Sequence, residues 1–353
     1  MGDQDMRTIT RAVSATDTRT APAPGENTLL EVRDLRVDLH LRRGTVKAVA
    51  GLSYHVGRHE TLAIVGESGS GKSVAAHAVL GVLNELPVHE IHGSVRLSGT
   101  ELLTMPERER RAVRGDRLSL ISQNSSLNPV FTVGWQVGEP FRVHRGMSQA
   151  QSLKHAAELL DRVGIPSAST RVNDYPHQFS GGQRQRASIA MALALEPDVL
   201  IADEPTTALD VTIQAQIMEL LTELKDENGM GLILITHDLG LVAEAADRVV
   251  VMYAGREVET GTAEEIFTSP AHPYTRGLLR SIPDVSHKRD RLHPIKGSPP
   301  DLMRPPSGCP FHPRCEWASE LCSTELPPAQ PLGPGRAASC HRLEEVAGVS
   351  HRD

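Results

Sequence analysis

The chain has 353 residues, of which 39% are hydrophobic and 23% are charged, a composition typical of a globular protein with one large domain or two ordinary ones. Its 37 Lys and Arg residues against 44 Asp and Glu residues give a net charge of −7, which argues against broad binding to nucleic acids or anionic lipids, since both favour a basic face. The sequence has neither the roughly 18 consecutive apolar residues of a membrane-spanning helix nor the basic-then-apolar order of a secretion signal, and we therefore expect a cytoplasmic protein.

The first 270 residues alternate between apolar runs and helical patterns. We expect residues 1–27, which are rich in Thr, Ala, Asp and Arg, to form a disordered leader. Short β-like runs follow within 29–67 and at 93–99. Four apolar runs are typical of buried parallel strands, at 62–65, 199–202, 232–235 and 248–252. Helical patterns at 74–83, 147–164, 182–195 and 212–228 separate them, which predicts an α/β fold with a parallel sheet.

The composition changes after about residue 270. Seven prolines between positions 294 and 313 exclude a long regular helix there, and all four cysteines lie in the same part of the chain. We place a boundary near Ser269–His272, which predicts a main domain at 28–270 and a small loop-rich extension at 271–353.

A glycine-rich loop directly after the run at 62–65 is the strongest motif. Its candidate phosphate-binding residues are Gly66, Ser68, Gly69, Ser70, Gly71, Lys72 and Ser73. Glycines let backbone N–H groups wrap phosphates, and the N-terminus of the following helix adds a favourable dipole. Lys72 would reach the β- and γ-phosphates, and Ser73 would ligate Mg²⁺. A Gly-Ser turn that matches by accident is the alternative, but the strand before the loop and the helix after it favour nucleotide binding.

Two adjacent carboxylates, Asp203 and Glu204, end the apolar run that begins at Val199. Beside a phosphate loop, Asp203 suits the Mg²⁺ shell, and Glu204 is placed to polarise the water that attacks the phosphate. Without that loop, we would interpret the pair as ordinary solvated acids at the end of a strand.

A second anion site is predicted where the helical pattern at 182–195 begins, at Ser180, Gly181, Gly182 and Gln183. A helix that starts with Ser-Gly-Gly offers a hydroxyl and bare N–H groups to an anion. Because the chain already has one phosphate site, a second site needs a second nucleotide, and two chains placed head to tail would satisfy both. Taken alone, these residues would be no more than a helix N-cap.

In this order the motifs resemble those of the ATP-binding-cassette (ABC) family, over about residues 29–270. The resemblance implies a P-loop NTPase fold with a RecA-like core, an antiparallel β subdomain and a helical signature subdomain. It also implies that Gln123 contacts Mg²⁺ and the attacking water and that His237 contacts the γ-phosphate. Asp210, in Ala208-Leu-Asp210, would help to couple two sites across a dimer.

One feature departs from the ABC pattern. The family usually stacks the adenine ring on an aromatic residue upstream of the loop lysine, and residues 41–47 contain none. Arg43, through a cation–π contact, or Val46 would cover the base instead.

The extension resembles the C-terminal region of ATPases from oligopeptide, dipeptide and nickel importers. The resemblance rests on His272-Pro-Tyr, Ile295-Lys-Gly-Ser-Pro-Pro and Cys309-Pro-Phe-His-Pro-Arg-Cys315, together with Ser126-Leu-Asn-Pro129 after Gln123. It implies import rather than export.

The four cysteines, Cys309, Cys315, Cys322 and Cys340, are spaced C-x5-C-x6-C-x17-C and lack the C-x2-C knuckles usual in zinc ribbons. Disulfides are disfavoured in a reducing compartment. Four thiolates on a proline-broken loop suit a [4Fe–4S] cluster, and some members of the resembled group carry one, so we favour a cluster over zinc or free thiols. Its role would be structural or regulatory, since hydrolysis needs none of it.

Together these expectations describe the ATP-hydrolysing subunit of an ABC importer at the cytoplasmic face of the cell membrane. Di- and oligopeptides are the first candidates for the solute, with nickel or another solute as the alternative. Since the chain has no spanning helix, two permease subunits would be separate proteins. The resemblance adds a second, non-identical ATPase subunit and an extracytoplasmic solute-binding protein as partners, and no nucleic acid.

Two other functions fit the sequence less well. A soluble ABC ATPase of DNA repair is disfavoured because only 56 residues, without sustained heptads, separate Gln123 from Ser180, and translation cassettes usually come in two copies per chain. A metal–sulfur scaffold with a vestigial ATPase is opposed by the complete set of catalytic residues.

Overall fold

The computed structural model describes Gly25 and residues 27–83, 89–123, 127–207, 209–281 and 294–347. The leader expected at 1–27 lies almost entirely outside the described residues, as do Ser126 and Ala208 of the motifs above. The strands are β1 Thr28–Leu41, β2 Gly44–Gly57, β3 Thr61–Val65, β4 His89–Leu97, β5 Thr100–Glu101, β6 Leu118–Ile121, β7 Val199–Asp203, β8 Gly231–Thr236, β9 Arg248–Tyr253, β10 Arg256–Thr262, β11 Gln330–Gly333 and β12 Arg336–Ala338. The helices are α1 Lys72–Leu80, α2 Glu107–Val113, α3 Val133–Val137, α4 Glu139–Arg145, α5 Gln149–Arg162, α6 Ala168–Arg171, α7 Gly181–Ala192, α8 Val211–Asn228, α9 Leu239–Ala245, α10 Ala263–Thr268, α11 Pro273–Arg280, α12 Glu320–Thr324 and α13 Leu343–Ala347, with 3₁₀ turns η2 Pro176–Gln178 and η3 His312–Arg314.

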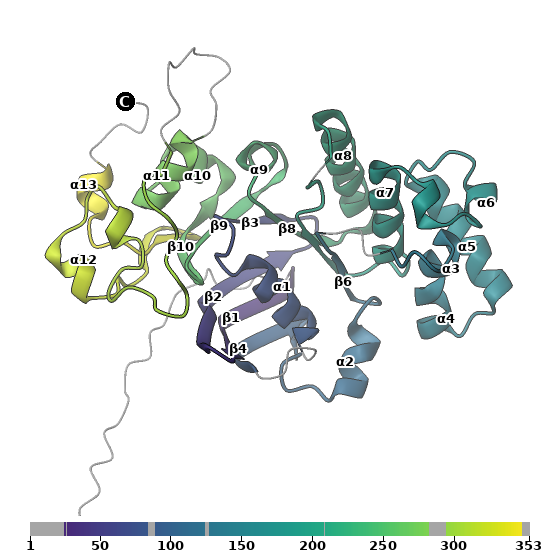
Figure 1. Ribbon diagram of the computed structural model, residues 1–353, viewed down its shortest axis with the longest axis horizontal. Coiled ribbons are helices and arrows are strands. Elements are labelled where there is room, and N and C mark those ends of the chain that lie inside the picture. The colour runs from purple at the N-terminus through teal and green to yellow at the C-terminus, as the bar shows by residue number, and fades with distance from the viewer. Residues whose placement is uncertain are drawn as a thin grey trace, which may run out of the picture.

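The centre of the molecule is a sheet with the strand order β11-β12-β10-β9-β3-β8-β7-β6 (Figure 1). The strands β9, β3, β8, β7 and β6 run parallel, and β10, β12 and β11 continue the sheet in antiparallel pairing. The four predicted parallel strands are confirmed as β3, β7, β8 and β9, and every residue of β3, β7 and β8 is buried. The sequence analysis misses β6, which is only four residues long and contains Ser119. Because parallel strands end at a common edge, the loops after β3, β7 and β8 meet there.

A second sheet, antiparallel and ordered β2-β1-β4-β5, packs against α1 and the central sheet. Leu30 of β1, Val56 of β2, Leu62 of β3 and Val79 of α1 are fully buried in one hydrophobic cluster. The loop between β3 and α1 therefore connects two elements that share this core.

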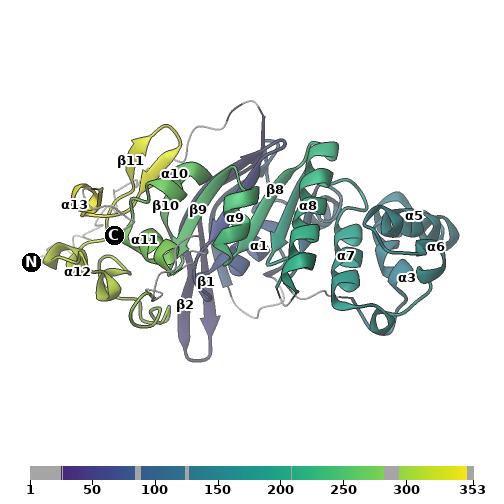
Figure 2. The same cartoon turned by 90° about the horizontal axis from the view of Figure 1, so that it is seen from above.

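Helices α3 to α7 form one end of the molecule (Figure 2). The helix predicted at 147–164 is confirmed as α5, which begins at the capping box of Ser148 with Gln151. Its buried face packs Ala156 and Leu160 into a cluster with Ile189 of α7. Among the described helices, none combines the length and the apolar character needed to cross a membrane.

The extension lies at the opposite end, around α11, α12 and α13 (Figures 1 and 2). Its strand β12 pairs with β10, with Ala338 opposite Glu259, and so joins the central sheet. Tyr274 of α11 and Phe311 are buried in a cluster with Val251 of β9. The extension therefore shares both a sheet and a hydrophobic core with the rest of the chain. The domain boundary expected near residue 270 stays a prediction.

Replacing Glu259 by alanine is expected to destabilise the junction between β10 and the extension. The Glu259 side chain is fully buried and accepts hydrogen bonds from the N–H groups of Ala271 (2.7 Å) and His272 (2.8 Å), just before α11. Two buried donors left unpaired cost roughly 2 kcal/mol or more of unfolding free energy, which urea denaturation would measure. The exposed Glu244 of α9 is the control, since Glu244→Ala removes no buried acceptor. Equal stability of the two variants would contradict the structural role of Glu259.

Candidate functional site

The phosphate-loop motif follows β3, as predicted from the sequence, and its last two residues, Lys72 and Ser73, begin α1. Two of its glycines are required by close backbone packing. Gly66 has φ +155° and Gly71 has φ +98°, and a Cβ at these positions would come within 2.2 Å of the Met252 carbonyl oxygen and 2.1 Å of the Ala48 carbonyl oxygen. No other residue type fits these positions without displacing the neighbouring strands.

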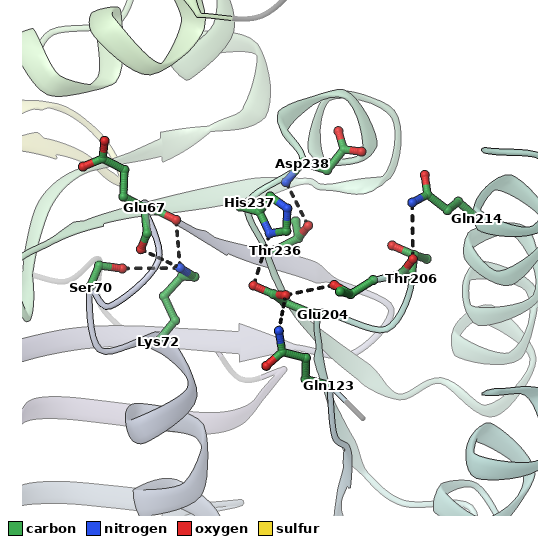
Figure 3. Close-up of polar contacts among 12 residues, drawn as sticks. Glu67, Ser70, Lys72, Gln123, Glu204, Thr206, Gln214, Thr236, His237 and Asp238 are labelled. Carbon is green, nitrogen blue, oxygen red and sulfur yellow. Dashed lines mark hydrogen bonds and ion pairs between the residues drawn. The ribbon is translucent and has the colours of Figure 1, made fainter. Parts of the chain in front are cut away.

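Lys72, the first residue of α1, turns its side chain back into the loop (Figure 3). Its ammonium group donates hydrogen bonds to the carbonyl oxygens of Gly66 (2.8 Å) and Glu67 (3.0 Å). A longer contact of 3.4 Å joins it to the Ser70 hydroxyl. Burial lowers the pKa of Lys72, although the charges of Glu204, Asp203 and Glu67 oppose that shift. The loop thus encloses a buried cation, in the segment predicted to bind phosphate.

Asp203 and Ser73 meet at the end of β7. The Ser73 hydroxyl hydrogen-bonds to the Asp203 carboxylate, whose pKa is raised mainly by burial. The other carboxylate oxygen, Oδ1, is buried and has no hydrogen-bond partner among the described residues. A buried carboxylate oxygen beside a hydroxyl fits a Mg²⁺ ion, which prefers hard oxygen ligands and keeps water or phosphate oxygens as its remaining ligands.

Glu204 is the centre of the polar network in Figure 3. Its carboxylate accepts hydrogen bonds from the Gln123 amide (2.7 Å) and the Thr207 hydroxyl (2.9 Å), and the His237 ring nitrogen Nδ1 lies 3.2 Å away. Gln123 comes just after β6 and His237 just after β8, so three neighbouring strand ends meet at one carboxylate. Glu204 itself has φ +49°, a strained backbone conformation that its N–H bond to the Ile235 carbonyl (2.8 Å) maintains.

This network also sets the charge of Glu204. Burial by itself raises the pKa of the Glu204 carboxyl, but the bonds from Thr207 and His237 and the charge of Lys72 bring it below its usual value. Glu204 is therefore ionised at neutral pH. The sequence analysis missed Thr207, although a hydroxyl three residues after a catalytic carboxylate would have been a reasonable candidate.

A cleft of about 480 Å³ opens beside Glu204. Its lining consists of Gly66, Glu67, Ser68, Gln123, Glu204, Thr207, His237, Leu239 and Leu278. The structure thus brings the phosphate loop together with Gln123, Glu204 and His237. Among the described residues that line the cleft, none belongs to the signature at 180–183.

The signature residues lie instead at the start of α7. Ser180 is the N-cap of this helix, and its hydroxyl accepts a hydrogen bond from the Gln183 N–H (3.3 Å). The Gln183 side chain accepts in return from the Ser180 N–H (3.1 Å) and from Arg171 (3.1 Å). Asp210 likewise caps α8 by accepting from the Ile213 N–H (3.0 Å). In a single chain these residues therefore serve as helix caps, and their predicted role across a dimer stays a prediction.

The residues predicted to cover adenine lie at the hairpin between β1 and β2. Arg43 is exposed and Val46 is partly buried. The extension approaches this hairpin, because the Lys47 N–H lies 3.4 Å from the Leu302 carbonyl oxygen. Contact between Arg43 or Val46 and a base stays a prediction.

The iron–sulfur prediction is not supported by the cysteine geometry. All four cysteines are free thiols that line one small cavity. Over the described part of the chain, however, no three His, Cys, Asp or Glu side chains are grouped so that they could hold a metal ion. Burial raises the pKa of Cys315 to about 12 and that of Cys340 to about 11, which favours neutral thiols in this arrangement.

Two family models match the chain. One is described as an ABC transporter and matches residues 49–207; the other is described as the C-terminal region of oligopeptide/dipeptide transporters and matches residues 258–322. The oligopeptide transport ATP-binding protein OppD of Salmonella typhimurium is 49% identical over 338 residues, which cover 95% of this chain and 100% of that protein. A putative peptide import ATP-binding protein of Brucella melitensis is 47% identical over 332 residues, covering 90% of this chain and 98% of the relative.

Two solved structures each resemble about two thirds of the chain. A dimeric bacterial ABC transporter cassette, 27% identical, superposes with a TM-score of 0.59 over 67% of this chain and 99% of its own. The protein cbiO1 of Clostridium perfringens, part of an ABC transporter complex, is 29% identical and gives a TM-score of 0.57 over 69% of this chain and 91% of its own. Both likenesses confirm the predicted cassette fold.

Proposed function

The chain belongs to the ABC transporter family, and from this premise we propose that it is the ATP-hydrolysing subunit that powers import of di- or oligopeptides. The observation that carries peptide import is the 49% identity to OppD, which extends over 95% of the chain and so includes the extension. The cleft supports ATP hydrolysis, since it is lined by residues 66–68 of the phosphate loop and by Gln123, Glu204, Thr207 and His237 of the Glu204 network. Lys72 lies behind this lining and bonds to the Gly66 and Glu67 carbonyl oxygens.

In the proposed reaction, the loop at 66–73 grips the phosphates of ATP and Lys72 turns from its own loop carbonyls toward them. Mg²⁺, held by Ser73 and Asp203, would neutralise phosphate charge. Glu204, held by Gln123, Thr207 and His237, polarises a water molecule in the cleft for attack on the γ-phosphate. No covalent enzyme intermediate is required.

Two such chains are proposed to close head to tail around two ATP molecules. Each ATP would be bound by the phosphate loop of one chain and the signature at Ser180–Gly182 of the other. The absence of signature residues from the described lining of the cleft supports this arrangement, because the N-terminus of α7 can accept an anion yet does not take part in the cleft of its own chain. A related cassette was solved as a dimer.

The proposed partners are two membrane-spanning permeases, a second ATPase subunit and an extracytoplasmic solute-binding protein, which would place the chain at the cytoplasmic face of the membrane. Nickel import is the second candidate, because the same type of extension occurs in that group. A role in DNA repair or translation lacks support, since OppD is named an oligopeptide transport protein and the Brucella melitensis relative a putative peptide import protein.

A [4Fe–4S] cluster on Cys309, Cys315, Cys322 and Cys340 is a separate proposal that rests on their spacing and on the one cavity that they share. It requires the thiols to turn toward a common centre, and it takes no part in the hydrolysis described above. Anaerobic purification followed by iron and sulfide analysis tests it: about four of each per chain would support it, and their absence would exclude it.

The transport function is tested by purifying the tagged chain with Glu204→Gln, which should trap the ATP-bound state, from native membranes. We expect two multi-spanning permeases and a second ATPase to copurify, and we expect deletion of the gene to abolish uptake of a labelled tripeptide but not of nickel. Copurification of only soluble proteins, ribosomes or DNA would contradict transport. Loss of nickel uptake alone would replace peptide by nickel.

A further inference from the structure

Glu67 is the only acidic residue of the phosphate loop at 66–73. Both its backbone N–H and its side-chain carboxylate are bonded to residues of the extension. Its backbone N–H donates a hydrogen bond to the Tyr274 hydroxyl of α11 at 2.8 Å. Its carboxylate is paired with Arg314, which is 247 residues away in the sequence. The second residue of the proposed phosphate loop is thus held in place by the extension.

The pair between Arg314 and Glu67 has the geometry of a strong, two-point ion pair. One guanidinium nitrogen lies 2.6 Å from Oε2 and the other lies 3.0 Å from Oε1. The Arg314 side chain is only 5% exposed and the Glu67 side chain is 26% exposed. In Figure 3 the Glu67 carboxylate points away from Lys72, on the opposite side of the loop.

Arg314 is itself held rigidly by its surroundings. It ends the 3₁₀ turn η3, between Cys309 and Cys315, and its Nε donates to the Lys296 carbonyl oxygen at 2.9 Å. A second contact of 3.2 Å reaches the Tyr253 hydroxyl. Its guanidinium therefore has two hydrogen-bond partners besides Glu67.

Three aromatic rings next to Arg314 form a close cluster. Tyr253 and Phe311 meet edge to face with centroids 5.2 Å apart, and Tyr274 lies 4.5 Å from Tyr253 and 5.4 Å from Phe311. This cluster joins β9, α11 and the residue before η3, so the extension cannot shift without moving the Glu67 contacts.

The charge of Glu67 conflicts with the proposed ligand. ATP brings several negative charges to the loop, and the Glu67 carboxylate is close enough to act on the pKa of Lys72. Left unpaired, it would repel the phosphates and compete for the Lys72 ammonium group. Pairing with Arg314 offsets that charge, and the paired carboxylate points away from Lys72 (Figure 3).

We propose that Arg314 is a positioning residue for ATP binding, which neutralises Glu67 and fixes the phosphate loop in its binding conformation. The proposal rests on the assignment of residues 66–73 as the phosphate site. It gives the extension a role in the ATPase reaction that does not involve its cysteines.

A double-mutant cycle on the full-length chain tests the proposal, with KM and kcat for MgATP hydrolysis and the Kd for MgATP as readouts. We expect Arg314→Gln to raise KM and Kd about tenfold, within the usual range of coupling between sites, with kcat within about twofold of wild type, because uniform binding is lost. Glu67→Gln is expected to lower both constants about threefold, because Arg314 then presents an unpaired charge to the phosphates. The double variant is expected to return close to wild type.

The opposite signs separate this role from a purely structural one. If the ion pair served only to hold the fold, both single variants would break it and both would raise KM, and the double variant would recover nothing. Either of those results would overturn the proposal. Arg314→Lys, which keeps the charge and loses the two-point geometry, is expected to recover most of the affinity.

Controls keep the cycle interpretable. Arg304→Gln changes an exposed arginine of the same extension and is expected to leave both constants unchanged. If Arg314→Gln does not fold, as judged by circular dichroism, the fall in KM expected for Glu67→Gln still decides the question. A wild-type chain that binds no MgATP would instead overturn the assignment of the phosphate site.

Discussion

Replacing Glu204 by glutamine is expected to lower kcat for ATP hydrolysis by about a thousandfold while the Kd for MgATP stays within about threefold of wild type. Glutamine has the same size and still hydrogen-bonds to its neighbours, so the network of Gln123, Thr207 and His237 would remain in place. It lacks the negative charge with which Glu204 polarises water. Single-turnover hydrolysis and equilibrium binding measure the two quantities separately.

Glu223→Gln is the matched control for this experiment. Glu223 is an exposed carboxylate on α8, and its replacement is expected to leave hydrolysis unchanged. Hydrolysis by the Glu204 variant within about tenfold of wild type, a loss too small for the main base, would show that another group activates the water.

The position of the candidate site could be predicted because its motifs follow apolar strands directly. Val199–Asp203 and Gly231–Thr236 are buried on both faces, which gives continuous apolar runs in the sequence, and the polar residues that follow must then lie at one sheet edge. The glycine pattern of the phosphate loop is equally local, since it reflects close approach of the strands behind Gly66 and Gly71.

The contacts between the extension and the loop could not be predicted, because nothing local marks them. Arg314 occurs within a motif whose cysteines draw attention to metal binding, and its partner lies near the start of the chain. Tyr274 and Phe311 are brought together by long-range packing, since both belong to a cluster with Val251 of β9, and β12 of the extension pairs with β10. The cysteine spacing likewise indicated that the four cysteines lie close together, and they do line one cavity. It could not predict the side-chain directions on which metal binding depends.

The capping box of α7 also shows what can and cannot be predicted from the sequence of one chain. The sequence located the start of α7 within two residues, since Ser180 and Gln183 form a recognisable cap. Whether the same N–H groups also receive a phosphate depends on a second chain, and no pattern within one chain determines that geometry.

Replacing Lys72 by alanine is expected to weaken MgATP binding more than a hundredfold, or by about 3 kcal/mol, since a buried charge-assisted contact to phosphate is lost. The Lys72 side chain is 5% exposed and already lies within the loop, so it can exchange its bonds to the Gly66 and Glu67 carbonyls for bonds to phosphate with little movement. Isothermal titration with MgATP measures the loss. Lys154→Ala, on the exposed face of α5, is the control and is expected to bind normally.

The double variant of Lys72→Ala with Glu204→Gln discriminates between the two roles. If Lys72 acts in binding and Glu204 only in the chemical step, the double variant should have the weak affinity of the Lys72 variant and should not copurify with the permeases, because no ATP-bound state forms to be trapped. If it retained the affinity of the Glu204 variant, then Lys72 would not be the main phosphate ligand, and the backbone N–H groups of the loop together with the helix dipole of α1 would have to supply the binding.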